Sequence, residues 1–142
     1  MRKVESVTDM YEFAKDVGSK LTPAEHHAQL LTLSGDLGAG KTTFVQGLAN
    51  YFGITLPITS PTFVIQKTYP LTDKPFKVLV HIDAYRLESA NELERLGWQE
   101  TLSNPTALIV LEWPEKVASS IPDWAKKLRF EHDSENTRIV YV

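Results

Sequence analysis

Residues 35–42, Gly-Asp-Leu-Gly-Ala-Gly-Lys-Thr, constrain this chain more than any other segment, because they satisfy the pattern G-x-x-x-x-G-K-[ST]. Before them, the short apolar run Gln29–Leu33 predicts a buried strand, and after them Thr42–Phe52 predicts a helix that ends at Gly53. Between a strand and a helix, the glycines let successive backbone N–H groups point inward at phosphate oxygens. The helix presents its positive N-terminal end to the same oxygens. The sequence therefore predicts a phosphate-binding loop, and with it nucleotide binding.

The loop residues have separate expected roles at the nucleotide. Lys41, which we expect to be an exposed loop residue, reaches the β- and γ-phosphates, and the Thr42 hydroxyl ligates Mg²⁺. The expected cofactors are therefore ATP and Mg²⁺. The residues of this region that we expect to contact the nucleotide are Asp36, Leu37, Gly38, Ala39, Gly40, Lys41, Thr42 and Thr43.

The rest of the chain alternates between helical and strand patterns without a repeat or a linker, which predicts one domain over residues 1–142. Helices are expected at Thr8–Leu21 and at about Glu88–Leu96, where Gly97 follows. Strands are expected at Phe63–Tyr69, Phe76–Ile82, Ala107–Leu111, Leu128–His132 and Arg138–Val142. We therefore expect an α/β fold with a mixed, P-loop NTPase-like sheet, flanked by helices and closed by a C-terminal β-hairpin.

Composition excludes several classes of protein. The chain has no cysteine, which rules out disulfides and thiolate sites. Met1–Ser6 carries no apolar run of the kind a signal peptide needs, and no segment approaches the ~20 apolar residues of a membrane helix. We therefore expect a cytoplasmic protein without a membrane partner. Its net charge is -3 and its basic clusters are short, such as Lys126–Arg129, so any RNA is expected to be held by another chain.

Two acidic residues follow predicted strands and are candidate catalytic groups. Asp83 comes just after Phe76–Ile82, at the carboxyl edge where α/β sheets bind their ligands, although an aspartate there also suits a simple turn. Such a carboxylate can hold a Mg²⁺-bound water or orient the attacking water. Glu112 ends the apolar run Ala107–Leu111, which is the Walker B position that bears on Mg²⁺ directly or through water. A buried, unpaired carboxylate would be costly, so Glu112 should have a metal or cationic partner.

The neighbours of Asp83 have less specific expectations. His81 is expected to be a core histidine with satisfied hydrogen bonds, and Tyr85 to bury its ring. Arg86 is expected either to neutralise phosphate or to pair with a carboxylate such as Glu88.

Three more segments narrow the function beyond nucleotide binding: Ser60–Phe63, His81–Arg86 and Val110–Pro114. Together with Gly35–Phe44, these segments resemble the motifs of the bacterial TsaE (YjeE) family in residue sequence and in order along the chain. The resemblance covers about half of the chain. That family is the ATPase component of the machinery that makes N6-threonylcarbamoyladenosine at position 37 of tRNAs decoding ANN codons. The resemblance implies a protein that binds and hydrolyses ATP while docked on the threonylcarbamoyl-transferring subunit and its dimerising partner. It would contact tRNA only through that complex.

The resemblance also implies roles for residues that the pattern alone leaves open. Thr62, otherwise part of a plain Ser-Pro-Thr turn, would sense the γ-phosphate and Mg²⁺ and order its loop in the triphosphate state. Trp113, otherwise a core residue, would lie near the nucleotide, and Thr8 and Arg138 would border the adenine. Residues Leu96–Leu102 depart from the family pattern, so no role is carried over to them.

Two other functions fit the same loop. The first is a small-molecule kinase, but a kinase usually carries a lid with several arginines, and this chain has few arginines, spread along its length. The second is a switch in which ATP orders the Thr62 loop to control docking and hydrolysis is incidental.

Overall fold

The computed structural model describes residues 1–36, 38–55 and 65–142. Leu37, Thr62 and the first two residues of the strand expected at Phe63–Tyr69 lie outside these ranges. In chain order the elements are β1 (Arg2–Val4), α1 (Val7–Lys20), β2 (Gln29–Ser34), α2 (Lys41–Tyr51), β3 (Gln66–Pro70), β4 (Val78–Asp83), α3 (Ala90–Glu94), α4 (Trp98–Leu102), β5 (Ala107–Glu112), the 3₁₀ helix η1 (Pro114–Ser120), β6 (Lys126–His132) and β7 (Arg138–Tyr141).

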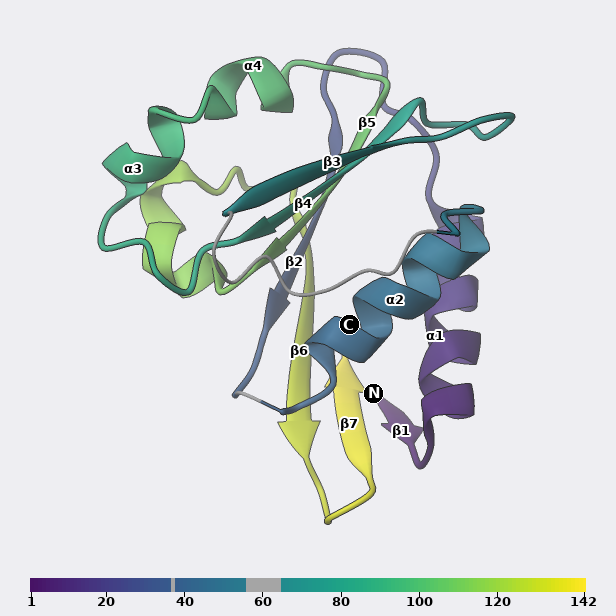
Figure 1. Ribbon diagram of the computed structural model, residues 1–142. Coiled ribbons are helices and arrows are strands. Elements are labelled where there is room, and N and C mark those ends of the chain that lie inside the picture. The colour runs from purple at the N-terminus through teal and green to yellow at the C-terminus, as the bar shows by residue number, and fades with distance from the viewer. Residues whose placement is uncertain (37, 56–64) are drawn as a thin grey trace.

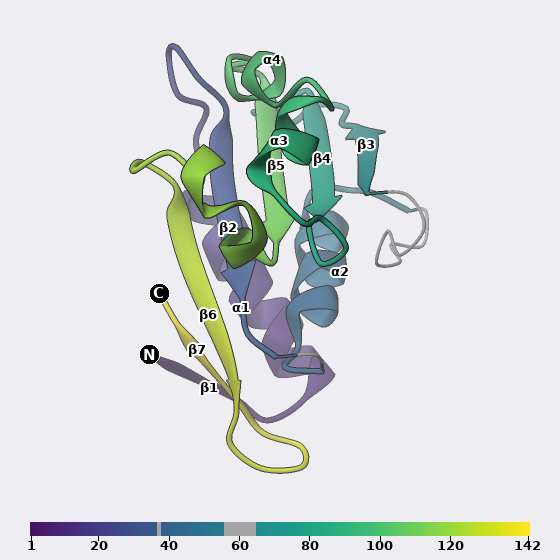
Figure 2. The same ribbon diagram turned by 90° about the vertical axis from the view of Figure 1, so that its left-hand side faces the viewer.

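A seven-stranded mixed sheet in the order β1-β7-β6-β2-β5-β4-β3 forms the centre of the molecule (Figure 1). The inner strands β6, β2, β5 and β4 are parallel, while β1, β7 and β3 join the two edges in antiparallel pairs. Helices α1 and α2 cover one face, and α3, α4 and η1 cover the other (Figure 2). Strand β5, covered on both faces, is buried along its whole length, which explains why it reads as a continuous apolar run. The predicted α/β class, mixed sheet and terminal hairpin are confirmed.

The face covered by α1 and α2 has the larger core. Ser6 caps α1 by accepting a hydrogen bond from the Asp9 N–H at 3.0 Å. The two helices approach closely because Gly47 has no side chain: a Cβ there would lie 3.1 Å from the Cα of Tyr11 and 3.0 Å from the Cβ of Ala14. This packing holds the beginnings of both helices next to the glycine loop.

The opposite face has a second core built around Trp98, which is 1% exposed. Its indole N–H donates to the Ser120 carbonyl at 2.8 Å, and the Ser120 hydroxyl donates to Glu94 at 2.9 Å. These bonds tie α4 to η1 and η1 to α3. Residues Leu96–Leu102, which depart from the family pattern, thus contribute Trp98 to the packing of this core. Of the described helices, none is both long and apolar enough to cross a bilayer.

Candidate functional site

The loop between β2 and α2 needs glycine at the positions where its backbone turns. Gly35 has φ +136, and a Cβ there would collide with the carbonyl oxygen of Phe130 on β6. Gly40 has φ +103 immediately before α2, and its Cβ would lie 2.8 Å from the Met10 side chain. Side chains at these positions would be strained and would also clash. The structure therefore has the strand, tight glycine turn and helix that the sequence predicts.

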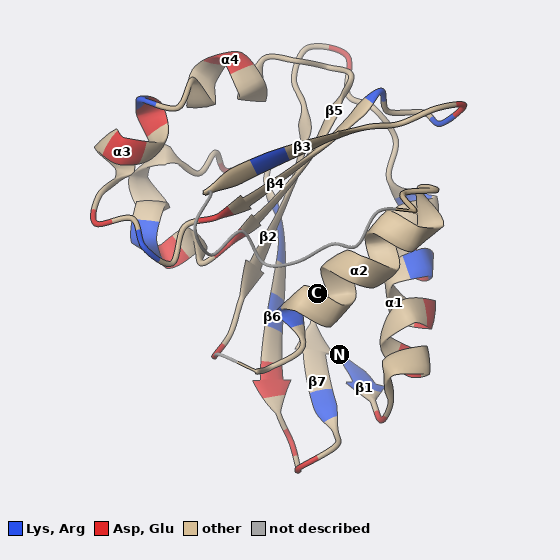
Figure 3. Cartoon of the chain, viewed as in Figure 1, with Lys and Arg blue, Asp and Glu red and all other residues tan. Residues whose placement is uncertain are grey.

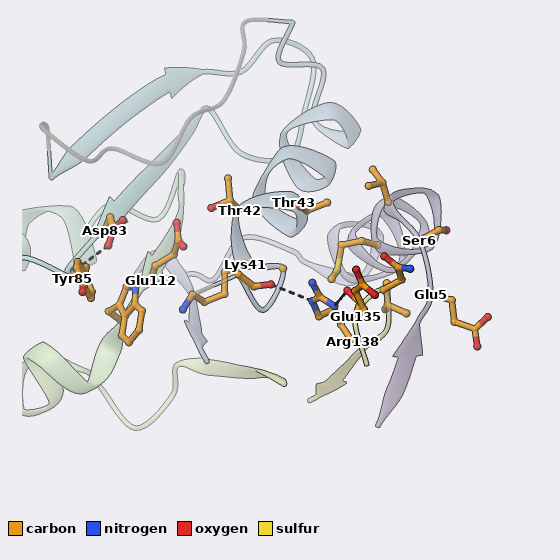
Figure 4. A pocket seen from close by; sticks show the side chains of 17 residues that line it. Glu5, Ser6, Lys41, Thr42, Thr43, Asp83, Tyr85, Glu112, Glu135 and Arg138 are labelled. Carbon is orange, nitrogen blue, oxygen red and sulfur yellow. Dashed lines mark hydrogen bonds between the residues drawn. The ribbon is translucent and has the colours of Figure 1, made fainter. Parts of the chain in front are cut away.

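A cavity of about 530 Å³ lies against this loop (Figure 4). Gly38, Gly40, Lys41, Thr42 and Thr43 contribute to its wall. Figure 4 shows carboxylates from β4 and β5 toward one end of the cavity, and side chains from the β6–β7 hairpin and the start of α1 toward the other. The pocket thus joins segments from both termini to the middle of the chain.

Lys41 is only 5% exposed, so the expectation that it is an exposed loop residue is wrong. Its ammonium donates to the Gly35 carbonyl, lies 3.5 Å from the Asp36 carbonyl, and stands 3.8 Å from the centre of the Trp113 ring. Burial lowers the pKa of Lys41, and the surrounding carboxylates, Glu112 foremost, oppose that shift. A lysine at the start of a helix is buried here because carbonyl oxygens and an aromatic face replace water around its charge.

The two candidate carboxylates sit at the ends of neighbouring parallel strands, where Asp83 is paired in register with Glu112. Glu112 is 2% exposed, and its Oε2 lies 2.6 Å from Nε2 of His81. The expected partner of this buried carboxylate is thus a histidine in this structure. Asp83 accepts a hydrogen bond from the Tyr85 N–H at 3.0 Å, so it also has the turn-forming role that the sequence left open.

Trp113 forms part of the cavity wall and also packs against the second core. It adopts φ 62, a left-handed conformation unusual for a bulky residue, directly after β5. In this conformation its ring faces the Lys41 ammonium and lies 5.0 Å from the ring of Tyr85. Tyr85 is 45% exposed, so the expectation that its ring is buried is wrong.

The residues expected near the adenine divide between the cavity and the surface. Arg138 lines the cavity, and its Nε donates to the Gly38 carbonyl at 3.2 Å, which ties the hairpin to the loop. Thr8 is exposed on α1 and does not line the cavity, although its neighbours Ser6 and Val7 do.

Two loop residues expected to contact the nucleotide also lie off this cavity. Ala39 is 1% exposed and belongs to the core beneath the loop. Asp36 is exposed and lines a second cavity of about 540 Å³, which shares Trp113 with the first. Leu37 and Thr62 lie outside the described residues, so their expected roles stay predictions.

Sequence reasoning missed the wall contributed by Val4, Met10, Glu135 and Asn136. These residues meet at the loop because β1 pairs with β7, with Val4 opposite Arg138. No local pattern in the sequence indicates which strand pairs with β1.

A family model described as "Threonylcarbamoyl adenosine biosynthesis protein TsaE" matches residues 4–140. Three proteins named tRNA threonylcarbamoyladenosine biosynthesis protein TsaE are similar. The Bacillus subtilis protein is 43% identical over 73% of this chain and 63% of its own length. The Streptomyces coelicolor protein is 40% identical over 82% of this chain and 78% of its own length. The Rickettsia conorii protein is 32% identical over 100% of this chain and 77% of its own length. A crystal structure of Bacillus subtilis YdiB superimposes with a TM-score of 0.77 at 27% identity, covering 98% of this chain and 80% of that one. The sequence resemblance and the fold therefore agree, and the chain belongs to the TsaE family.

Proposed function

We propose that this chain is the ATP-binding and ATP-hydrolysing subunit of the machinery that makes N6-threonylcarbamoyladenosine at position 37 of tRNA. As a member of the TsaE family it takes part in tRNA threonylcarbamoyladenosine biosynthesis. One observation carries the ATPase proposal: Lys41, Thr42 and two strand-end carboxylates, Asp83 and Glu112, line a single cavity at the glycine loop. Anion-binding and metal-binding groups thus converge on one space.

The phosphate end of the proposed site uses the loop and the start of α2. The positive helix end and the loop N–H groups attract phosphate oxygens. The Lys41 ammonium, held by the carbonyl of Gly35 and the face of Trp113, would exchange the carbonyl for a phosphate oxygen. Since phosphate carries a full charge and a carbonyl does not, this exchange favours nucleotide binding.

The donor set at the other end of the cavity fits Mg²⁺. Thr42, Asp83 and Glu112 all offer oxygen atoms, which are the ligands Mg²⁺ prefers. No cluster of three His, Cys, Asp or Glu able to hold a metal exists among the described residues. Mg²⁺ needs none, because it usually takes one or two carboxylates together with phosphates and waters. When bound, Mg²⁺ would neutralise the charge that develops on the phosphates, while Asp83 or Glu112 orients the attacking water.

We further propose that the chain acts on the threonylcarbamoyl-transferring subunit and its dimerising partner, in the cytoplasm, without transferring the group itself. Membership of the TsaE family supports this role, because the matching proteins are named for tRNA threonylcarbamoyladenosine biosynthesis. The net charge of -3 on this chain gives RNA little to bind.

Titration calorimetry and a turnover assay test the ATPase proposal. Lys41→Met should abolish measurable Mg·ATP binding, while the exposed Lys126→Met, on a strand end away from the loop, should bind like wild type. Wild type should release inorganic phosphate from ATP. Wild-type affinity in the Lys41 variant would refute the phosphate site. Transfer of the phosphoryl group to a small acceptor in place of water would favour a kinase.

A further inference from the structure

His81 is buried at the candidate site in a way that simple packing does not explain. It lies on β4 two residues before Asp83, so both side chains share one face of the strand. The neighbour on the same face, Leu79, belongs to the core beneath α2. His81 is 0% exposed, and an aliphatic side chain would fill such a place without any hydrogen-bonding requirement.

The two ring nitrogens of His81 differ in what they contact. Nε2 lies 2.6 Å from Oε2 of Glu112. A carboxylate oxygen accepts, so the proton of this hydrogen bond belongs to Nε2. Nδ1 is buried and has no hydrogen-bond partner within the described residues. Buried polar atoms usually have a hydrogen-bond partner, so a buried histidine with one unpartnered nitrogen needs an explanation. The hydrogen bond that Nε2 makes to Glu112 offers one.

The contact limits how the Glu112 carboxylate can turn. Lys41, which also lines the cavity, directs its ammonium at the carbonyls of Gly35 and Asp36. Oε2 of Glu112 therefore depends on His81, while the second oxygen is left for the cavity that Glu112 lines. Without the donor, the carboxylate would be free to rotate toward the Lys41 ammonium.

We propose that His81 is a positioning residue, whose Nε2–H holds one oxygen of Glu112 so that the other faces the metal and water side of the nucleotide cavity. The inference rests on the proposed role of Glu112 in the ATPase site. His81 contacts neither nucleotide nor metal and acts through Glu112 alone.

Two substitutions of His81 separate positioning from packing. His81→Gln can place an amide N–H near the position of Nε2, whereas His81→Asn reaches only as far as Nδ1. The Asn variant should lose tenfold or more in turnover, and the Gln variant should stay within about threefold of wild type. With ADP as the probe, Asn should reduce the gain in affinity that Mg²⁺ gives, while affinity in EDTA stays unchanged. Equal behaviour of the two variants, in either measurement, would overturn the proposal.

A double variant tests whether His81 acts through Glu112. In a Glu112→Gln background, His81→Asn should change the Mg²⁺-dependent gain in ADP affinity by less than about twofold, because the positioned carboxylate is already gone. A further loss equal to that in the wild-type background would contradict the inference.

A measurement on the unmodified chain covers the case in which His81→Asn does not fold. The ¹⁵N resonance of His81 Nε2 should move when Mg²⁺ joins bound ADP, and much less when ADP binds in EDTA. An unmoved resonance would overturn the positioning role. Absence of any Mg²⁺-dependent ADP binding in wild type would instead overturn the proposed function, and this inference with it.

Discussion

Lys41 carries a charge that the folded chain disfavours. Its ammonium is almost fully removed from water and is surrounded by carbonyl oxygens, an aromatic ring and carboxylates at longer range. Burial lowers its pKa below the ordinary lysine value of 10.5, which means that the folded state disfavours the charge. A triphosphate would supply the counter-charge that the protein alone does not.

Lys41→Met should therefore remove nucleotide binding without lowering the free energy of unfolding. The sign of its pH dependence follows from the lowered pKa. Between the folded-state pKa and 10.5, the unfolded chain binds more protons than the folded chain, so the wild-type stability contribution of Lys41 rises with pH. Urea unfolding of wild type and variant over that range should show a difference that shifts in favour of wild type as pH increases. A difference independent of pH would show that Lys41 is not desolvated in solution.

Glu112→Gln should leave Mg·ATP binding measurable and reduce kcat tenfold or more, which corresponds to about 1.4 kcal/mol of transition-state stabilisation. The amide keeps an oxygen to accept the hydrogen bond from His81, so the change removes charge and little else. Steady-state phosphate release is the measurement, with Asp83→Asn alongside. If Glu112→Gln were within threefold of wild type and Asp83→Asn were inactive, Asp83 would be the main catalytic carboxylate.

At the scale of elements, the sequence predicted those whose own pattern is strong. The strand, glycine turn and helix of β2 and α2 and the fully buried β5 appear within one or two residues of their expected ends. Strand β1 has three residues and α4 has five, too few for periodicity to show. Both depend on contacts with residues far away in the sequence: β1 pairs with β7, and α4 is anchored by the hydrogen bond from Trp98 to Ser120. The helix predicted at about Glu88–Leu96 is shorter in the structure, Ala90–Glu94, and Gly97 at φ 81, where it was expected to end, separates α3 from α4.

Gly47→Leu should destabilise the α1–α2 pair. A side chain there meets Tyr11 and Ala14 of α1 at about 3 Å, so α1 must move away from α2. Overpacking of this kind costs about 1–3 kcal/mol. Asn50→Leu, on the exposed side of α2, is the matched control and should change stability by less than about 0.5 kcal/mol. Equal urea midpoints for the two variants would show that a leucine fits between α1 and α2, contrary to the close contacts in the structure.

At the scale of the whole molecule, the candidate site was predictable in the parts that short patterns or the family resemblance mark. The glycine loop, Asp83 and Glu112 could be found from short patterns, and Trp113 from the resemblance. Of these described residues, all except Gly35, Asp36 and Ala39 line the cavity. The wall formed by Ser6, Val7, Glu135 and Asn136 comes from the two ends of the chain, whose pairing is a property of the sheet. No local pattern carries that information.

The distribution of charged residues bears on what the cavity can bind and stabilise. Figure 3 shows acidic residues on α3 and α4 and basic residues dispersed over several elements of the described chain. Among the described residues, Arg138 is the arginine that lines the cavity. Its guanidinium already donates to the carbonyls of Gly38, Ser134, Glu135 and Thr137. These bonds link the hairpin to the glycine loop, and no other arginine of the described residues lines the cavity.

The isolated chain should therefore hydrolyse ATP slowly and be stimulated tenfold or more by the threonylcarbamoyl-transferring subunit and its dimerising partner. P-loop proteins without a well-placed arginine gain greatly when a partner supplies or orders the missing group. tRNA alone should not stimulate, because phosphate contacts by Lys and Arg dominate RNA affinity and this chain carries a net charge of -3. The measurement is phosphate release at matched ionic strength by the chain alone, with tRNA, and with the protein pair. Fast turnover by the chain alone, or stimulation by tRNA without the proteins, would contradict the prediction that the partner proteins complete the catalytic site.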